Sequence, residues 1–321
     1  MKFGLVVQGP LISAGRTGKI PLKNRKDLTE DDIVKFECIE NIVKIKKQCS
    51  EKNVKFICVV WSNEEKTILD KLFKMLGSET ILLIDDLDTN IKYKGLKINP
   101  NDFNNVSYNE PLGLNKYRQI ISSLEGIEYL SKSGCEIILK LRSDQNLNIE
   151  KLFDDYLRVK NKRNLKIMVP AINTKKLYTL TDWWMCGNAI DLIKIFNFYI
   201  SSNEYNNNVH IDYFFKFFFS NYKFLFFLFT KLPFVFGKKK IFNIWNEFYC
   251  PSSLDVFNTA EFRGEKIEHI KEENIFIENL NDSFFLKENN PKLVRSKYIH
   301  YDFNFNLKYK LLKFFDKWLT K

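Results

Sequence analysis

Strand-like and helix-like segments alternate through the first half of the chain, and this alternation constrains the fold more than any other feature. Apolar runs typical of buried strands lie at residues 2–8, 55–61, 80–84, 136–141 and 167–171. Helical periodicity fills the intervals, most clearly over residues 113–133. Strands that alternate with helices form βαβ units, whose crossovers cover both faces of a parallel sheet. The sequence therefore predicts an α/β fold with a Rossmann-type, mostly parallel sheet and helices on both faces.

The starts of two earlier helices are marked by possible capping residues. Thr29 and Asp32 resemble a capping box that opens the first helix. Ser62 and Glu65 resemble a second one, directly before a helix expected over residues 64–76. Both patterns predict that the helix begins within a few residues of the cap.

Composition favours a folded protein with an anionic partner. Hydrophobic residues make up 45% of the 321 residues and charged residues 28%, enough for a sizeable core. The net charge of +11 suggests nucleic acid, a nucleotide or phosphate ligand, or an acidic membrane face. The six cysteines show no C-x-x-C spacing, which disfavours zinc and a disulfide framework and favours reduced core residues. No secretory signal or spanning segment is expected, so the predicted location is the cytoplasm.

Charged and polar residues follow the predicted strands, where parallel sheets bind ligands. They are residues 8–10, 62–63, 85–88 and 142–145, and they include acidic residues as well as an arginine. A phosphate-bearing ligand fits such an edge. The sequence has no G-x-G-x-x-G after its first strand and no P-loop, which argues against dinucleotide enzymes and P-loop NTPases. It also lacks the G-x-S-x-G elbow of esterases.

Four short motifs carry a family resemblance. They are V-V-Q-G-P at 6–10, N-x-x-R-Q-I at 115–120, K-L-R-S-D-Q at 140–145 and T-D-W-W-x-x-G at 181–187. In this order they resemble the WavE-type lipopolysaccharide-synthesis family, whose members are regarded as GT-A-like glycosyltransferases. The resemblance implies a GT-A-like domain over residues 1–200 that binds a nucleotide-sugar and is catalytic. Residues 201–321 would form an acceptor-side, helical, Phe/Lys-rich C-terminal region.

The resemblance also implies a donor site. Its residues would be Gln8, Gly9, Pro10, Asn63, Asn115, Arg118, Gln119, Arg142 and Asp144. GT-A enzymes hold a divalent metal, Mn²⁺ or Mg²⁺, on an acidic D-x-D motif, but here the first acid is Arg142. Either Asp144 alone anchors the metal, or Arg142 and Arg118 replace part of its charge. A literal D-x-D at residues 86–88 lies before the long helix, out of family order, and is interpreted as an acidic turn.

The implied acceptor site comprises Asp182, Trp183, Trp184 and Gly187. Trp rings can pack against the C–H faces of sugars, although a buried Trp pair in the core is the alternative. Arg142 would stabilise the departing diphosphate. A general base is expected at Asp212, by its order along the chain, with Asp182 and Glu247 as competitors.

The last third is rich in Phe and Lys, notably at residues 213–236 and 307–319. Its lysines disfavour a spanning helix and suit peripheral contact with the anionic inner membrane, the alternative being a pair of core helices. Nucleic acid is disfavoured because no recognised motif accompanies the basic residues.

The resulting prediction is transfer of a sugar to a lipid-linked glycan acceptor, in lipopolysaccharide core or capsule biosynthesis. The alternatives are a sugar-phosphate transferase and a non-catalytic glycan- or membrane-surface-binding protein on the same fold.

Overall fold

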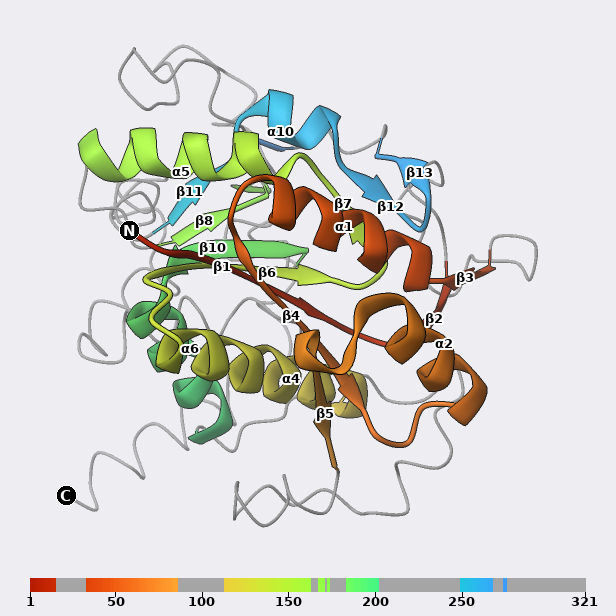
Figure 1. Ribbon diagram of the computed structural model, residues 1–321. Helices are drawn as coiled ribbons and strands as arrows, with labels where there is room; N and C mark the ends of the chain where they lie inside the picture. Colours follow the sequence, from red (N-terminus) through yellow and green to blue (C-terminus); the bar gives the residue numbers. More distant parts are fainter. Residues whose placement is uncertain are drawn as a thin grey trace, which may run out of the picture.

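A seven-stranded sheet lies at the centre of the protein, in the order β11-β8-β10-β6-β1-β4-β5 (Figure 1). The computed structural model describes residues 1–15, 33–85, 113–162, 167–170, 172–173, 183–201, 249–267 and 274–275. The central strands are β1 (Phe3–Gln8), β4 (Lys55–Trp61), β5 (Ile81–Ile84), β6 (Ile137–Arg142), β8 (Ile167–Val169), β10 (Trp184–Asn188) and β11 (Tyr249–Pro251). Only β10 runs against its neighbours, β6 and β8; the other pairs are parallel. The predicted α/β fold with a mostly parallel sheet is confirmed.

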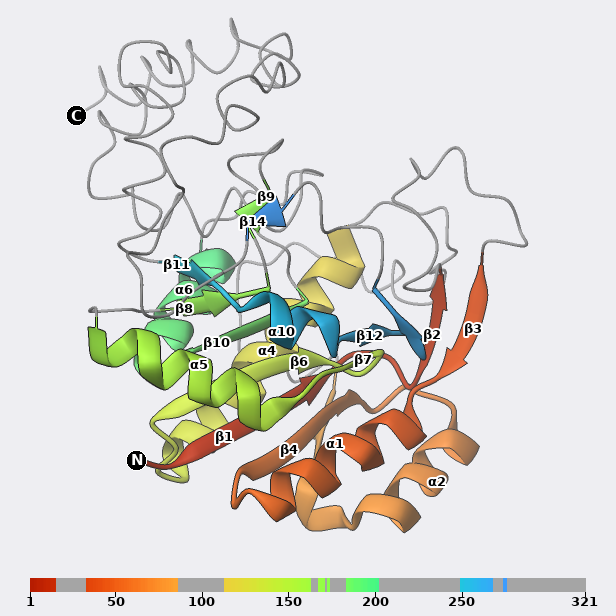
Figure 2. The same ribbon diagram turned by 90° about the horizontal axis from the view of Figure 1, so that it is seen from above.

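Helices cover both faces of this sheet (Figures 1 and 2). On one face lie α4 (Gly113–Lys132) and α6 (Ala189–Ser201), and on the other lie α1 (Ile39–Glu51), α2 (Lys66–Leu76), α5 (Ile149–Lys162) and α10 (Leu254–Asn258). Because both faces are covered, Leu5, Val6 and Val7 of β1 are all fully buried although their side chains alternate between the faces. The mostly apolar runs at β1, β4 and β6 follow from this arrangement, and in β6 the run is interrupted by Lys140, which is itself buried.

Short elements extend from the carboxyl ends of the central strands. They are β2 (Ile12–Gly15) paired with β3 (Val34–Glu37), the sheet β13 (Glu265–Lys266)-β12 (Glu261–Phe262)-β7 (Gln145–Asn146), and the pair β14 (Asn274–Ile275)-β9 (Ile172–Asn173). The 3-10 turn η3 (Ser78–Thr80) lies at the opposite edge, directly before β5. β2 follows β1 and β7 follows β6, so these small sheets flank the edge of the central sheet at which ligands are expected.

Helix α4 lies very close to the sheet because its middle residue, Gly126, has no side chain. A Cβ atom added there would come within 2.5 Å of Val6 Cγ1 and 2.8 Å of Val59 Cγ2. The helix ends at Lys132, and Gly134 behind it takes the left-handed conformation that favours glycine, with φ +86°. Both ends of this helix match the prediction to within a residue.

The two predicted caps are wrong. Residues 34–37 form β3, so the first helix begins at Ile39 rather than near Thr29, and no side chain caps it. Helix α2 begins at Lys66, and its N-cap residue is Glu65, whose side chain accepts from the Thr67 hydroxyl and does not cap a backbone N–H. The helix predicted over residues 64–76 is itself present, as Lys66–Leu76, so only its cap is wrong. Before α1, residues 34–37 pair with β2 as a strand and so cannot begin the helix.

Residues from the last third complete the same core. β11 pairs with β8 in parallel register, and Val256 and Phe257 of α10 are fully buried in the core beside α5. The division at residue 200 stays a prediction. The Phe/Lys-rich segments at 213–236 and 307–319 lie outside the described residues. No helix in the described ranges is both long and apolar enough to cross a bilayer.

All six cysteines are free and buried, as expected of reduced core residues. Burial raises the pKa of the Cys38 and Cys49 thiols to about 12, so neither forms the reactive thiolate at neutral pH. We therefore expect no N-ethylmaleimide adducts on the folded protein within minutes at pH 7, and complete labelling in guanidinium chloride. Intact-mass spectrometry measures both. Rapid modification of the native protein would contradict this burial.

Candidate functional site

Two of the predicted donor segments meet at the carboxyl edge of the central sheet. Gln8, the last residue of β1, is level with Val59 of β4 on one side and with Arg142 of β6 on the other. This register places the loop after β1 beside the turn after β6. The two segments are more than a hundred residues apart in the sequence, and the parallel pairing alone brings them together.

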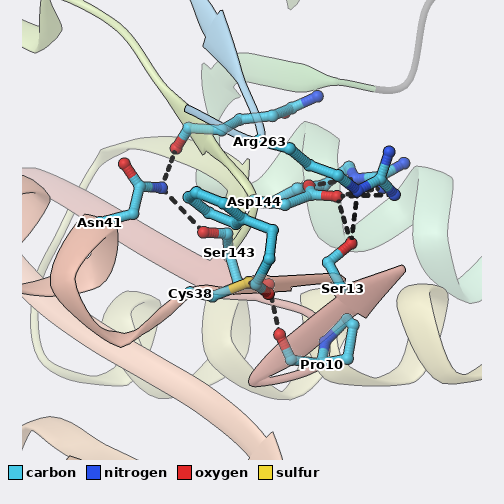
Figure 3. A network of polar contacts seen from close by, with 10 residues as sticks. Pro10, Ser13, Cys38, Asn41, Ser143, Asp144 and Arg263 are labelled. Atoms are coloured by element: carbon cyan, nitrogen blue, oxygen red, sulfur yellow. Dashed lines mark hydrogen bonds and ion pairs between the residues drawn. The ribbon is translucent and has the colours of Figure 1, made fainter. Parts of the chain in front are cut away.

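Ser143 fastens these two loops to each other. Its backbone N–H donates to the carbonyl of Gln8 at 2.8 Å, and its hydroxyl donates to the carbonyl of Pro10 at 2.8 Å (Figure 3). Gly9 lies between the two acceptors with φ +135°, where a Cβ atom would come within 2.5 Å of the Ser143 hydroxyl oxygen. Only glycine fits this position without strain.

We expect Gly9→Ala to lower the free energy of unfolding by about 1–3 kcal/mol, because the new methyl group both strains the backbone and displaces the Ser143 hydroxyl. Urea denaturation at neutral pH measures the change. Pro10→Ala is the matched control, since Pro10 is exposed. Equal stability of the Gly9 and Pro10 variants would contradict the close contact with Ser143.

Asp144 is buried at the centre of a cluster of charges (Figure 3). Arg142 donates to both of its carboxylate oxygens, from Nε at 3.0 Å and from Nη2 at 2.8 Å. The Ser13 hydroxyl donates to Oδ2 at 2.7 Å, and Arg263 Nη2 lies 3.2 Å from the same oxygen. Arg263 also donates from Nε to the Ser13 hydroxyl oxygen at 3.0 Å. One carboxylate thus orients two guanidinium groups at the edge of the sheet.

The charges around Asp144 decide its protonation. Burial is the largest single influence and by itself would raise the pKa of Asp144. The positive charges of Arg142 and Arg263, with the hydrogen bonds from Arg142 and Ser13, together outweigh it and hold the pKa below its ordinary value. The side chain is therefore a carboxylate at neutral pH and acts as the anchor of the two arginines.

Arg263 was not predicted to be a site residue. It sits in the turn between β12 and β13, where its own φ is +50° and that of Gly264 is +78°. Two consecutive positive φ values are typical of a tight hairpin turn, and the Arg-Gly pair is the sequence clue that could have indicated it. The backbone N–H of Arg263 also donates to the carbonyl of Asp144 at 2.8 Å.

Asn41 of α1 supports the turn that carries Asp144. Its amide nitrogen donates to the carbonyls of Ser143 and Gln145, both at 2.8 Å (Figure 3). Ser143 and Gln145 are each 1% exposed, so Asn41 supplies hydrogen bonds to carbonyl groups of two buried residues. Neither Asn41 nor Ser13 was predicted from the sequence, because nothing local distinguishes them from other polar residues.

A divalent metal does not fit the residues around Asp144. Both carboxylate oxygens already accept hydrogen bonds, and two guanidinium groups lie where a second cation would have to approach. Mg²⁺ and Mn²⁺ need several oxygen ligands, and no group of three or more acidic, His or Cys side chains suited to a metal occurs among the described residues. The sequence predicted either a metal held by Asp144 alone or arginine side chains that replace part of the metal's charge. The geometry favours the second arrangement. The second guanidinium group beside Asp144 is that of Arg263, and not that of the predicted Arg118.

Helix α4 brings a second polar group to the other side of Gln8. The Ser122 hydroxyl donates to Gln8 Oε1 at 3.0 Å, and the Arg118 guanidinium lies over the ring of Trp61, 5.3 Å from its centre. Gln119 lies beside Arg118, at the end of the helix that faces the sheet edge. The predicted donor residues of α4 therefore adjoin the loop after β1.

The remaining donor residues are near this edge as well. Asn115 lies in the first turn of α4, and Asn63 is in the exposed turn after β4. Glu64, which was not predicted, follows Asn63; burial raises its pKa, opposed by the backbone N–H of Leu11 and the charge of Arg118. A carboxylate in this position adds an acceptor group beside Arg118.

The predicted acceptor residues are only partly together. β10 runs antiparallel to β6, so Trp184 is level with Leu141 at the site edge, whereas Gly187 is level with Ile138 near the far end of β6. Trp183 is half-buried, and Trp184 is 1% exposed, as in the core alternative.

An aromatic cluster therefore lies beside the charged cluster. The Trp183 ring stacks on Phe257 and Phe262 at centroid distances of 6.0 and 5.9 Å. The guanidinium groups of Arg142 and Arg263 lie over Phe262, 5.5 and 4.3 Å from its centre.

Several predicted residues lie outside the described part of the chain. They are Asp182, Asp212 and Glu247, proposed as bases, and the acidic turn at 86–88. Their predicted roles stay predictions.

No family model matches the chain, and no curated protein matches it, so the resemblance to the WavE-type family stays a prediction. Among solved structures, the chain is similar to mannose-1-phosphate geranyltransferase from Thermus thermophilus, with 9% identity and a TM-score of 0.30. The similarity covers 63% of this chain and 62% of that one, which is less than two thirds of its length. A similarity this distant supports no conclusion about function. The function is therefore argued from the residues at the sheet edge.

Proposed function

We propose that this protein is a transferase that moves a sugar from a nucleotide-sugar donor to a hydroxyl acceptor. The observation that carries the proposal is the convergence of motifs: residues 8–10, 118–119, 142–144 and 183–184 adjoin one sheet edge. Each fragment by itself is unspecific. Their meeting at the place where parallel sheets bind ligands supports a common site.

The arginines support a role in stabilising the leaving group. In such a transfer the acceptor oxygen forms a bond to the anomeric carbon, while the bond from that carbon to the donor diphosphate breaks. The acceptor proton passes to a base, for which Asp182 and Asp212 are proposed. Negative charge then develops on the nucleoside diphosphate. Arg142, 24% exposed at its side chain and oriented by Asp144, would meet that charge.

The proposed acceptor is a lipid-linked surface glycan, as in lipopolysaccharide core or capsule synthesis. The support is the family resemblance together with the net charge of +11 and the Phe/Lys-rich composition of the last third, which suit an anionic membrane surface.

A thermal-shift screen against UDP, GDP, CMP and TDP tests the donor class. We expect one nucleotide to stabilise the folded protein by about 2.7 kcal/mol at 100 times its Kd. We expect the shift to be the same with EDTA as with Mn²⁺. Arg142→Lys keeps the charge but loses the bidentate geometry, and it should weaken the shift.

The released product separates the two transferase mechanisms. A nucleoside diphosphate indicates sugar transfer, and a nucleoside monophosphate indicates sugar-phosphate transfer. No shift with any nucleotide, in a protein shown to be folded by circular dichroism, would overturn the proposal and favour a non-catalytic binding protein.

A further inference from the structure

Two buried polar side chains near the arginines have no hydrogen-bond partner. Gln145 is 1% exposed, and both its amide oxygen and its amide nitrogen lack a partner within the described part of the chain. The indole N–H of Trp184, which is also 1% exposed, likewise lacks one there. Native proteins leave few such groups unsatisfied, because each is desolvated without compensation. Two of them in one region therefore require an explanation.

The register of the small sheet shows that both groups adjoin the aromatic cluster. Gln145 of β7 is directly opposite Phe262 of β12, and directly opposed residues of antiparallel strands project from the same face. Phe262 stacks on Trp183 with an interplanar angle of 16°, and the Trp183 ring centre is 6.3 Å from that of Trp184. Gln145 is therefore the strand partner of one member of the stack and Trp184 is the ring neighbour of another, and the guanidinium of Arg142 lies over Phe262.

We propose that Gln145 and Trp184 are specificity residues that bind hydroxyl groups of a sugar ring packed against Trp183. An amide offers two donors and an acceptor, and an indole offers one donor, which together match neighbouring hydroxyl groups. The aromatic faces beside them suit the apolar C–H surface of the same ring. This inference rests on the proposed function, because the sugar would arrive either on the donor diphosphate beside Arg142 or on the acceptor.

The first test measures the unliganded protein. Gln145→Met removes an amide that has no partner but nearly preserves its volume, so the variant should unfold at a higher urea concentration than the wild type. Gln48→Met is the matched control. The Gln48 amide donates to Asn146 Oδ1 at 3.1 Å and accepts from the Ile149 N–H at 3.3 Å, so the same substitution there should lower the midpoint. A lower midpoint for Gln145→Met would show that the amide is already satisfied in solution, for example by a buried water, and would overturn the inference.

The second test measures binding by isothermal titration calorimetry, with two sources of sugar. If the ring is the donor's, Gln145→Met should reduce the preference for a nucleotide-sugar over its nucleoside diphosphate by about tenfold and leave the diphosphate affinity unchanged. If the ring is the acceptor's, the same variant should weaken the binding of methyl glycosides by a similar factor. Trp184→Phe, which keeps an aromatic ring and loses the N–H, should act in the same direction.

The outcomes distinguish the inference from the proposed function. Unchanged binding of both sugar sources in the variant, with the nucleoside diphosphate still bound, would overturn the role of Gln145 and leave the transferase intact. Failure of the wild type to bind any nucleotide would overturn the transferase. In that case loss of glycoside binding in Gln145→Met would still support a sugar site, and unchanged glycoside binding would refute it.

Discussion

Asp144→Asn should lower the free energy of unfolding by about 3–5 kcal/mol at neutral pH, the largest effect that we expect from a single substitution. The amide keeps the size of the carboxylate but removes its negative charge. Arg142 and Arg263 would then face each other across a neutral group, with the Arg263 side chain only 8% exposed. Urea denaturation measures the loss. Asp255→Asn is the control: Asp255 pairs with Lys151 at 2.8 Å on the surface, and its loss should change stability by about 1 kcal/mol or less.

The pH dependence of this loss has a definite sign. The pKa of Asp144 is lower in the folded protein than in the unfolded chain, where it is about 3.9. Its stabilising contribution is therefore fully present above about pH 4 and disappears as the pH falls through the lower, folded-state pKa. The difference in stability between wild type and Asp144→Asn should be constant from pH 5 to 7 and shrink below pH 4. A difference that grows in acid would contradict the depressed pKa.

Gly126→Leu should destabilise the protein by about 3 kcal/mol or more, because the side chain would enter the space filled by Val6 and Val59. Gly126→Ala should cost less, since a better helix former gains about 1 kcal/mol against the clash of one methyl group. Lys132→Leu, at the exposed end of the same helix, is the control and should change stability by about 0.5 kcal/mol or less.

The Gly126 variants also test how α4 serves the site. A helix lifted from the sheet would carry Ser122 away from Gln8 and Arg118 away from Trp61. Nucleotide affinity should therefore fall in Gly126→Ala even under conditions in which the variant is fully folded. If Gly126→Leu were as stable as the wild type, α4 would not be seated on β1 and β4 as described.

The strands were predictable because their burial on both faces requires apolar residues, which the sequence shows directly. A strand covered on both faces needs apolar side chains at every position, and β1 and β4 show such runs within a residue of their bounds. The start of α1 was not predictable from its cap, since residues 34–37 pair with β2 as the strand β3 and are not part of a helix. Pairing between distant segments overrides a local preference worth about 1 kcal/mol.

The site was predictable where it follows strand ends and unpredictable where it depends on distant loops. Gln8, Arg142 and Asp144 come directly after apolar runs, so chain order and topology bring them to one edge. Ser13 and Arg263 meet at Asp144 although 250 residues separate them. No periodicity or spacing connects two such loops. Trp184 and Gly187 share a motif, yet β10 places Trp184 level with Leu141 at the site edge and Gly187 level with Ile138, toward the opposite end of β6.

The position of β11 has a consequence for how the chain assembles during synthesis. The segment that supplies β11 and Arg263 leaves the ribosome after almost all of the central sheet has been made. Until then β8 lacks β11, its outer neighbour among the described strands. Asp144 likewise has Arg142 beside it but not yet Arg263. An open strand edge of this kind favours association with other chains. The nascent protein would thus depend on its last third to protect the edge and to finish the charged cluster in one late step.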